Sequence, residues 1–114
     1  MGRGEGLESA QLVAVRTLAR ALPEAVEQDH FGRPSFRVRG RIFATLPDSE
    51  HLNVMIDAFD VDGVVRGYPS ACQELWWGKK LSGMRVNLGA ATPELIKELL
   101  ITAWQRKAPR SLKL

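Results

Sequence analysis

Four arginines fall within nine residues of this chain, a spacing that suits the binding of anions. They are Arg33, Arg37, Arg39 and Arg41. No acidic residue interrupts them, and Phe36 and Val38 alternate with them. Such alternation predicts a half-buried β-strand that keeps its arginines in water. A ribbon of arginines beyond a sheet can straddle phosphates or enter a groove, so the segment predicts a contact with nucleic acid.

The arginine-rich strand leads into a hairpin whose register the residues leave open. Gly40 permits a tight turn before a returning strand over residues 42–46. A two-residue turn at 39–40 places Phe36 opposite Phe43 and Arg41 on the apolar face of the first strand. A three-residue loop places Val38 opposite Ile42 and keeps the arginines in water.

A second unusual segment combines aromatic and cationic side chains. Trp76 and Trp77 are followed by Gly78, Lys79 and Lys80. On a strand the two indoles point to opposite faces, so at most one enters the core. The other either packs under the last helix or offers a stacking surface beside the lysines. A stacking ring beside cations suits single-stranded nucleic acid.

The remaining reactive residues form no recognisable catalytic or metal-binding pattern. His30 follows Asp29 and precedes Ser35, but no nucleophile elbow or oxyanion loop accompanies them, so we expect a structural histidine. His51 is isolated, which disfavours a metal site. Cys72 is the single cysteine, so no internal disulfide forms, and a buried inert thiol is expected. We therefore expect no cofactor, no metal and no enzymatic activity.

Composition indicates one small domain with an uneven charge distribution. The 114 residues carry a net charge of +3, with 45% hydrophobic residues. Five acids and no Lys or Arg occupy residues 42–65. This asymmetry either steers a polyanion to one side or reflects two solvated faces. Without a transmembrane run or an apolar leader, the chain is expected to be a cytoplasmic domain over 1–114, with a flexible tail at 1–6 and no membrane contact.

The hydrophobic pattern predicts an α+β fold. Helices are expected over 8–22, capped by Ser9, over 60–66, and after Thr92-Pro93, a cap followed by proline at the first helical position. Three or four strands separate the first two helices. Two more, over 74–79 and 84–88 with a turn at Ser82-Gly83, precede the last helix. This order predicts a two-layer sandwich, an antiparallel sheet with helices on one face.

The segment 30–44, HFGRPSFRVRGRIFA, resembles the signature of the MmcQ/YjbR family. A first helix ending in Ala21-Leu22-Pro23, a late strand with tryptophan, and Ala103-Trp104 in the last helix agree with it, so the resemblance spans roughly residues 7–109. Arg41 replaces an expected lysine, and Ala103-Trp104 replaces a common Ser-Tyr. The resemblance implies a fold akin to type III secretion chaperones and DNA binding through a double-wing arrangement of loops. It implies no catalytic residues.

Two functional hypotheses follow from these features. The first is a DNA-binding domain that uses Arg33, Arg37, Arg39, Arg41, Lys79 and Lys80, with Trp76 and Trp77 as stacking residues. The second is a protein-interaction or chaperone-like domain that binds another protein or a second copy of itself. A small-ligand binder or enzyme that uses His30 and the tryptophans is a third hypothesis.

Overall fold

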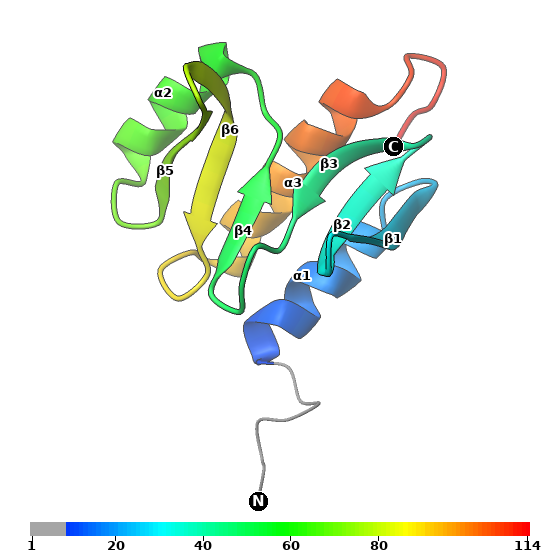
Figure 1. The fold of residues 1–114 in the computed structure, drawn as a ribbon, viewed down its shortest axis with the longest axis horizontal. Coiled ribbons are helices and arrows are strands. Elements are labelled where there is room, and N and C mark those ends of the chain that lie inside the picture. Colours follow the sequence, from blue (N-terminus) through cyan, green and yellow to red (C-terminus); the bar gives the residue numbers. More distant parts are fainter. Residues whose placement is uncertain (1–8) are drawn as a thin grey trace, which may run out of the picture.

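The computed structural model describes residues 9–114 as three helices and one six-stranded antiparallel sheet (Figure 1). The helices are α1 (Ala10–Arg20), α2 (Ala58–Gly67) and α3 (Pro93–Lys107). The strands are β1 (Ala25–His30), β2 (Arg33–Val38), β3 (Arg41–Thr45), β4 (His51–Val54), β5 (Cys72–Trp77) and β6 (Lys80–Asn87). The expected element order is confirmed. The expected tail over residues 1–6 lies outside the described residues.

Each helix begins at a residue whose side chain caps it. Ser9 accepts a hydrogen bond from the backbone N–H of Leu12, and Thr92 accepts one from that of Leu95. Asp57 caps α2 in the same way, which lets this helix form despite Gly63 in its interior. None of the helices in residues 9–114 is long and apolar enough to cross a membrane.

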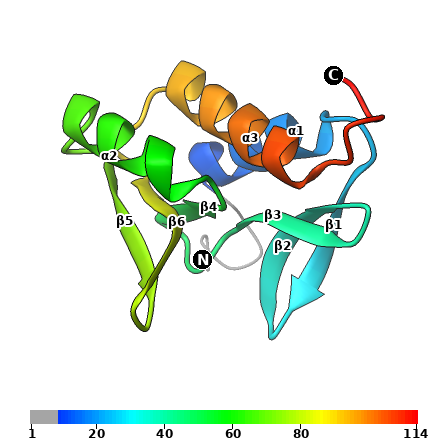
Figure 2. The same cartoon turned by 90° about the horizontal axis from the view of Figure 1, so that it is seen from above.

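The helices cover one face of the sheet, as the hydrophobic pattern predicted (Figure 2). The strand order is β1-β2-β3-β4-β6-β5. The core lies between the layers, and its largest fully buried side chains include Trp104 of α3 and Phe36 and Phe43 of the sheet. Trp104 donates a hydrogen bond from Nε1 to the carbonyl oxygen of Pro23, 2.9 Å away, which ties α3 to the loop before β1.

The β2–β3 hairpin has the two-residue turn of the first alternative. Arg39 and Gly40 both have positive φ, and Val38 pairs with Arg41. A bulge then shifts the register, so Phe36 lies opposite Ala44, whereas that alternative predicted Phe43. Bulges of this kind bend a strand and increase its twist.

The prediction of a turn at Ser82-Gly83 is wrong. The β5–β6 turn lies at Gly78-Lys79, where Gly78 has a φ of 62°. Gly83 is instead inside β6, because β4 passes so close that a Cβ there would lie 2.3 Å from the carbonyl oxygen of Val54. The glycine therefore marks a close backbone approach and not a turn.

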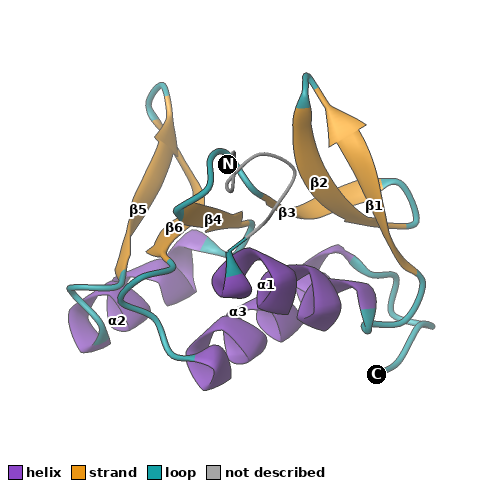
Figure 3. Ribbon diagram, turned by 90° about the horizontal axis from the view of Figure 1, so that it is seen from below, coloured by secondary structure: helices purple, strands orange, loops and turns teal. Residues whose placement is uncertain are grey.

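Two hairpins project from the sheet on the side away from the helices (Figure 3). We call β1 and β2 the first wing, and β5 and β6 the second wing. The central strands β3 and β4 lie between them, at the base of the space that the wings flank. Since the two wings are separated in sequence, residues from distant segments face each other across this space.

Candidate anion-binding cleft

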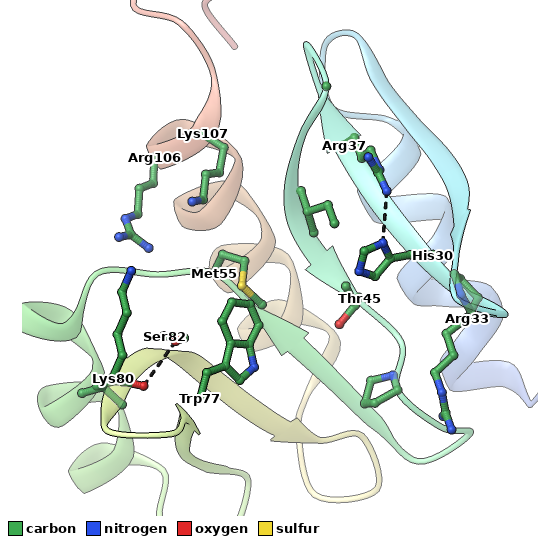
Figure 4. Close-up of a pocket in the computed structure, with 15 residues that line it drawn as sticks. His30, Arg33, Arg37, Thr45, Met55, Trp77, Lys80, Ser82, Arg106 and Lys107 are labelled. Carbon is green, nitrogen blue, oxygen red and sulfur yellow. Dashed lines mark hydrogen bonds between the residues drawn. The ribbon is translucent and has the colours of Figure 1, made fainter.

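A cavity of about 540 Å³ lies between the two wings, and we call it the interwing cleft (Figure 4). It is lined by His30, Arg33, Pro34, Arg37, Gly40, Ile42, Thr45, Pro47, Met55, Trp77, Lys80, Leu81, Ser82, Arg106 and Lys107. The first wing, β3, the second wing and the end of α3 all contribute to it. Its size falls within the range of small-molecule sites.

Arg37 is held in the wall formed by the first wing. Its Nε donates to the Oγ of Ser35 at 3.2 Å, and its Nη2 lies 3.3 Å from Nδ1 of His30. Ser35 is fully buried and in turn donates to the carbonyl oxygen of Gln28, 2.9 Å away. These contacts orient the guanidinium before any ligand arrives, which lowers the entropic cost of binding.

His30 has a defined hydrogen-bonding role in this wall. A guanidinium only donates, so Nδ1 of His30 accepts from Arg37 and the neutral ring carries its proton on Nε2. In Figure 4 that edge of the ring faces the cleft. The expectation of a structural histidine is compatible with this contact, and the ring also offers an N–H donor to the cleft.

The opposite wall combines an aromatic ring with a cluster of cations. Trp77 and Lys80 are paired residues of the second wing, and both line the cleft. Lys80 is directed toward the end of α3, where Arg106 and Lys107 lie (Figure 4). The C-terminal end of a helix favours cations, and here both Arg106 and Lys107 also line the cleft.

The charge of the cleft has one sign. Five arginines and lysines line it, and no acidic side chain of residues 9–114 does. Partial burial lowers the pKa of Lys107, and the neighbouring charges of Arg106, Arg41 and Lys80 lower it further. The cations therefore repel one another in the free protein, and an anion in the cleft would relieve that repulsion.

The floor of the cleft is largely apolar, with Thr45 of β3 beside the apolar side chains. Met55 is buried beneath it, and Ile42 and Leu81 line it as half-buried side chains. Cationic walls around an apolar floor suit a ligand that is charged at its edges and apolar on a flat face.

Half of the residues proposed from sequence lie away from the cleft. Arg39 forms a bidentate ion pair with Glu24, which lowers the pKa of that carboxyl group and raises the pKa of Arg39. Arg41 donates from Nη1 to the carbonyl oxygen of Lys107 at 3.3 Å, near the end of α3. Lys79 is exposed in the β5–β6 turn, outside the cleft lining.

The two tryptophans are separated, as expected for neighbours on a strand, and neither enters the core. Trp76 is half exposed outside the cleft and donates from Nε1 to Glu74 Oε1 at 3.0 Å. Trp77 is 60% exposed and lines the cleft. A bulge between Leu75 and Trp76 shifts their register against β6.

Sequence reasoning missed the contribution of α3. Arg106 and Lys107 lie in the last turn of α3, and only the packing of α3 beneath β3 brings them to the cleft. Cys72 is buried, as expected, and burial raises the pKa of its thiol. In residues 9–114 no group of three or more His, Cys, Asp or Glu side chains could hold a metal ion.

Comparison with known proteins identifies one family model and one solved structure. The family model described as YjbR matches residues 20–106. The crystal structure of Deinococcus radiodurans protein DR2400, with a DUF419 domain, superposes with a TM-score of 0.70 at 21% sequence identity, covering 86% of this chain and 80% of that one. No curated protein matches the chain. At this identity the structural likeness concerns the fold.

Proposed function

The chain belongs to the YjbR family, and we propose that this member binds nucleic acid through the interwing cleft. The observation that supports the proposal is the convergence of five cations from three separate segments on one cavity. They are Arg33 and Arg37 of the first wing, Lys80 of the second, and Arg106 and Lys107 of α3. Phosphates bound by such cations release counterions, which is the main source of affinity for nucleic acid.

The arrangement of the cations matches a linear polyanion. Arg33 and Arg37 lie on one wall, while Lys80 and the end of α3 form the other (Figure 4). A chain of phosphates that runs between the wings would meet cations on both sides. The orientation of Arg37 by Ser35 and His30 adds geometric specificity, because a fixed guanidinium can bind a phosphate in bidentate fashion.

The cleft narrows the arginine hypothesis to particular residues. Arg33, Arg37 and Lys80 belong to the proposed surface, whereas Arg39 is paired with Glu24 and Arg41 lies near the end of α3. A contact made by the whole arginine hairpin would use all four arginines. Single substitutions therefore separate a cleft from a hairpin contact.

The test is fluorescence anisotropy with labelled single-stranded and duplex oligonucleotides at low salt. We expect the Arg37→Ala and Lys80→Ala variants to weaken binding about tenfold each, since a charge-assisted contact contributes about 1.5 kcal/mol. Arg39→Ala and Arg66→Ala are the matched controls, because both remove an exposed arginine from an ion pair outside the cleft. Thermal melts confirm that each variant is folded.

Two results contradict the proposal. Absence of binding to either oligonucleotide at low salt removes nucleic acid as the ligand. An equal loss in the Arg37→Ala and Arg39→Ala variants moves the contact from the cleft to the exterior of the hairpin.

A protein-interaction role is the second candidate, supported by the open edge of the first wing. β1 is the terminal strand of the sheet, and Val26 and Phe31 on or beside it are exposed. Such an edge can pair with a strand of another chain. A concentration-dependent dimer in light scattering that the Val26→Lys variant abolishes would favour this role.

A further inference from the structure

We propose that the interwing cleft binds one unstacked nucleobase, with its ring on Trp77 and its adjoining phosphates on the cations of the two walls. This inference rests on the proposed nucleic-acid function and gives it a substrate class. The ligand is a base-bearing phosphate, presented either by a single strand or by a free nucleotide. A duplex keeps its bases stacked and paired, so it offers the cleft only its backbone.

The apolar floor is the first argument. Phosphates would satisfy the cationic walls, but they would leave the exposed apolar surface of the half-buried Ile42 and Leu81 in water. A purely electrostatic surface needs no apolar side chains between its cations. A flat heterocycle between the walls covers the floor and lets its phosphates reach the cations at the edge.

The position of Trp77 is the second argument. Its indole is 60% exposed, although a residue of this size normally buries most of its surface. It lies beside Lys80, its paired residue, and lines the cleft across from His30 and Arg37 (Figure 4). An exposed indole beside cations is the arrangement that single-strand-binding proteins use to stack bases without sequence selection.

His30 supplies the third argument. Because Nδ1 accepts from Arg37, the neutral ring presents an Nε2–H donor to the cleft. An N–H donor opposite a stacking ring can donate a hydrogen bond to a carbonyl oxygen or ring nitrogen on the edge of a base. A phosphate does not require a histidine at this position, because a lysine would bind it equally well. The cleft thus offers a stacking face, a donor for the edge and cations for the phosphates.

The experiment compares substitutions at two neighbouring tryptophans. Anisotropy is measured with a labelled 15-nucleotide oligo-dT, with a duplex of equal length, and in competition with thymidine monophosphate. Trp77→Ala is expected to weaken binding of the single strand about tenfold, and Trp77→Phe to retain most of the affinity. Trp76→Ala is the matched control, since it removes the same ring from outside the cleft. Duplex affinity is expected to be weaker and insensitive to Trp77.

The outcomes separate this inference from the proposed function. Equal, salt-sensitive binding of duplex and single strand that is unchanged in Trp77→Ala overturns the base-binding inference and leaves the phosphate contact standing. Thymidine monophosphate that binds by itself in titration calorimetry and loses affinity in Trp77→Ala, with no binding of any oligonucleotide, supports the base site and overturns the nucleic-acid function. Loss of affinity in Trp76→Ala equal to that in Trp77→Ala overturns the assignment to the cleft.

Discussion

The salt dependence of binding gives the sharpest test of the cleft, because the structure supplies the number of contacts. Five cations line the cleft. Each phosphate neutralised on a single strand contributes about −0.7 to the slope of log K against log salt, so full engagement predicts a slope of about −3.5. Raising KCl from 50 to 200 mM then weakens binding by roughly 100-fold.

Variants divide this slope into contributions from single residues. Arg37→Ala and Lys80→Ala should each make the slope shallower by about 0.7, and the double variant by about 1.4. Arg39→Ala should leave it unchanged, because that arginine is paired with Glu24 outside the cleft. The assay is anisotropy titration of labelled oligo-dT at four or more salt concentrations.

The reasoning is refuted by a slope near zero or by a slope that Arg39→Ala changes as much as Arg37→Ala does. The first result shows that phosphates do not occupy the cleft. The second shows that the contact is made elsewhere on the arginine hairpin.

Three further predictions concern the fold. Gly83→Ala should lower the free energy of unfolding by about 3 kcal/mol in urea titrations, because the new Cβ would collide with the carbonyl oxygen of Val54. Gly63→Ala should raise the free energy of unfolding by up to about 1 kcal/mol, because Gly63 lies on a helix with open space around it. Phe31→Asn should raise the melting temperature of the protein. Phe31 is 92% exposed, and its φ of 53° lies in a two-residue turn that favours the sequence Asn-Gly. A lower melting temperature would contradict this reasoning. The Cys72 thiol, whose pKa burial raises, should react with a thiol reagent only as fast as the protein unfolds; rapid reaction of the folded protein would show an accessible thiolate.

Local signals predicted the elements of the fold well. The Ser9 and Thr92 caps and the spacing of apolar residues identified the first and last helices, and the alternation after Pro34 identified β2. The prediction of a turn at Gly83 was wrong because glycine occurs both in turns and at close backbone contacts, and the sequence does not distinguish the two. The hairpin register depended on a bulge between Phe36 and Arg37, which no residue pattern in the sequence marks.

The candidate site was predicted in part, for a physical reason. Charge type and spacing identified Arg33, Arg37 and Lys80, which face the cleft, together with Arg39 and Arg41, which do not line it. The direction in which each arginine side chain points depends on the geometry of the turn and on partners such as Glu24, which is fifteen residues from Arg39 in sequence. The cations of α3 reach the cleft only through tertiary packing, which no local pattern records.

The lowered pKa of Lys107 links the charge of the cleft to its occupancy. Burial and the nearby cations Arg106, Arg41 and Lys80 disfavour its protonated form, so at neutral pH this charge costs folding stability. The folded pKa lies below the unfolded one, so this cost is present below the folded pKa and disappears as the pH rises through it. A bound phosphate would raise the pKa of Lys107 and favour the protonated lysine.

Binding should therefore take up a proton in the alkaline range. We expect affinity for oligo-dT to fall as the pH is raised from about 7 to about 10. In the Lys107→Arg variant the fall should begin at a higher pH, because arginine stays charged throughout this range. Parallel pH profiles of the two proteins would show that Lys107 makes no contact with the ligand. An earlier fall in wild type would place a phosphate beside the end of α3, where the structure brings together the charges that the sequence keeps apart.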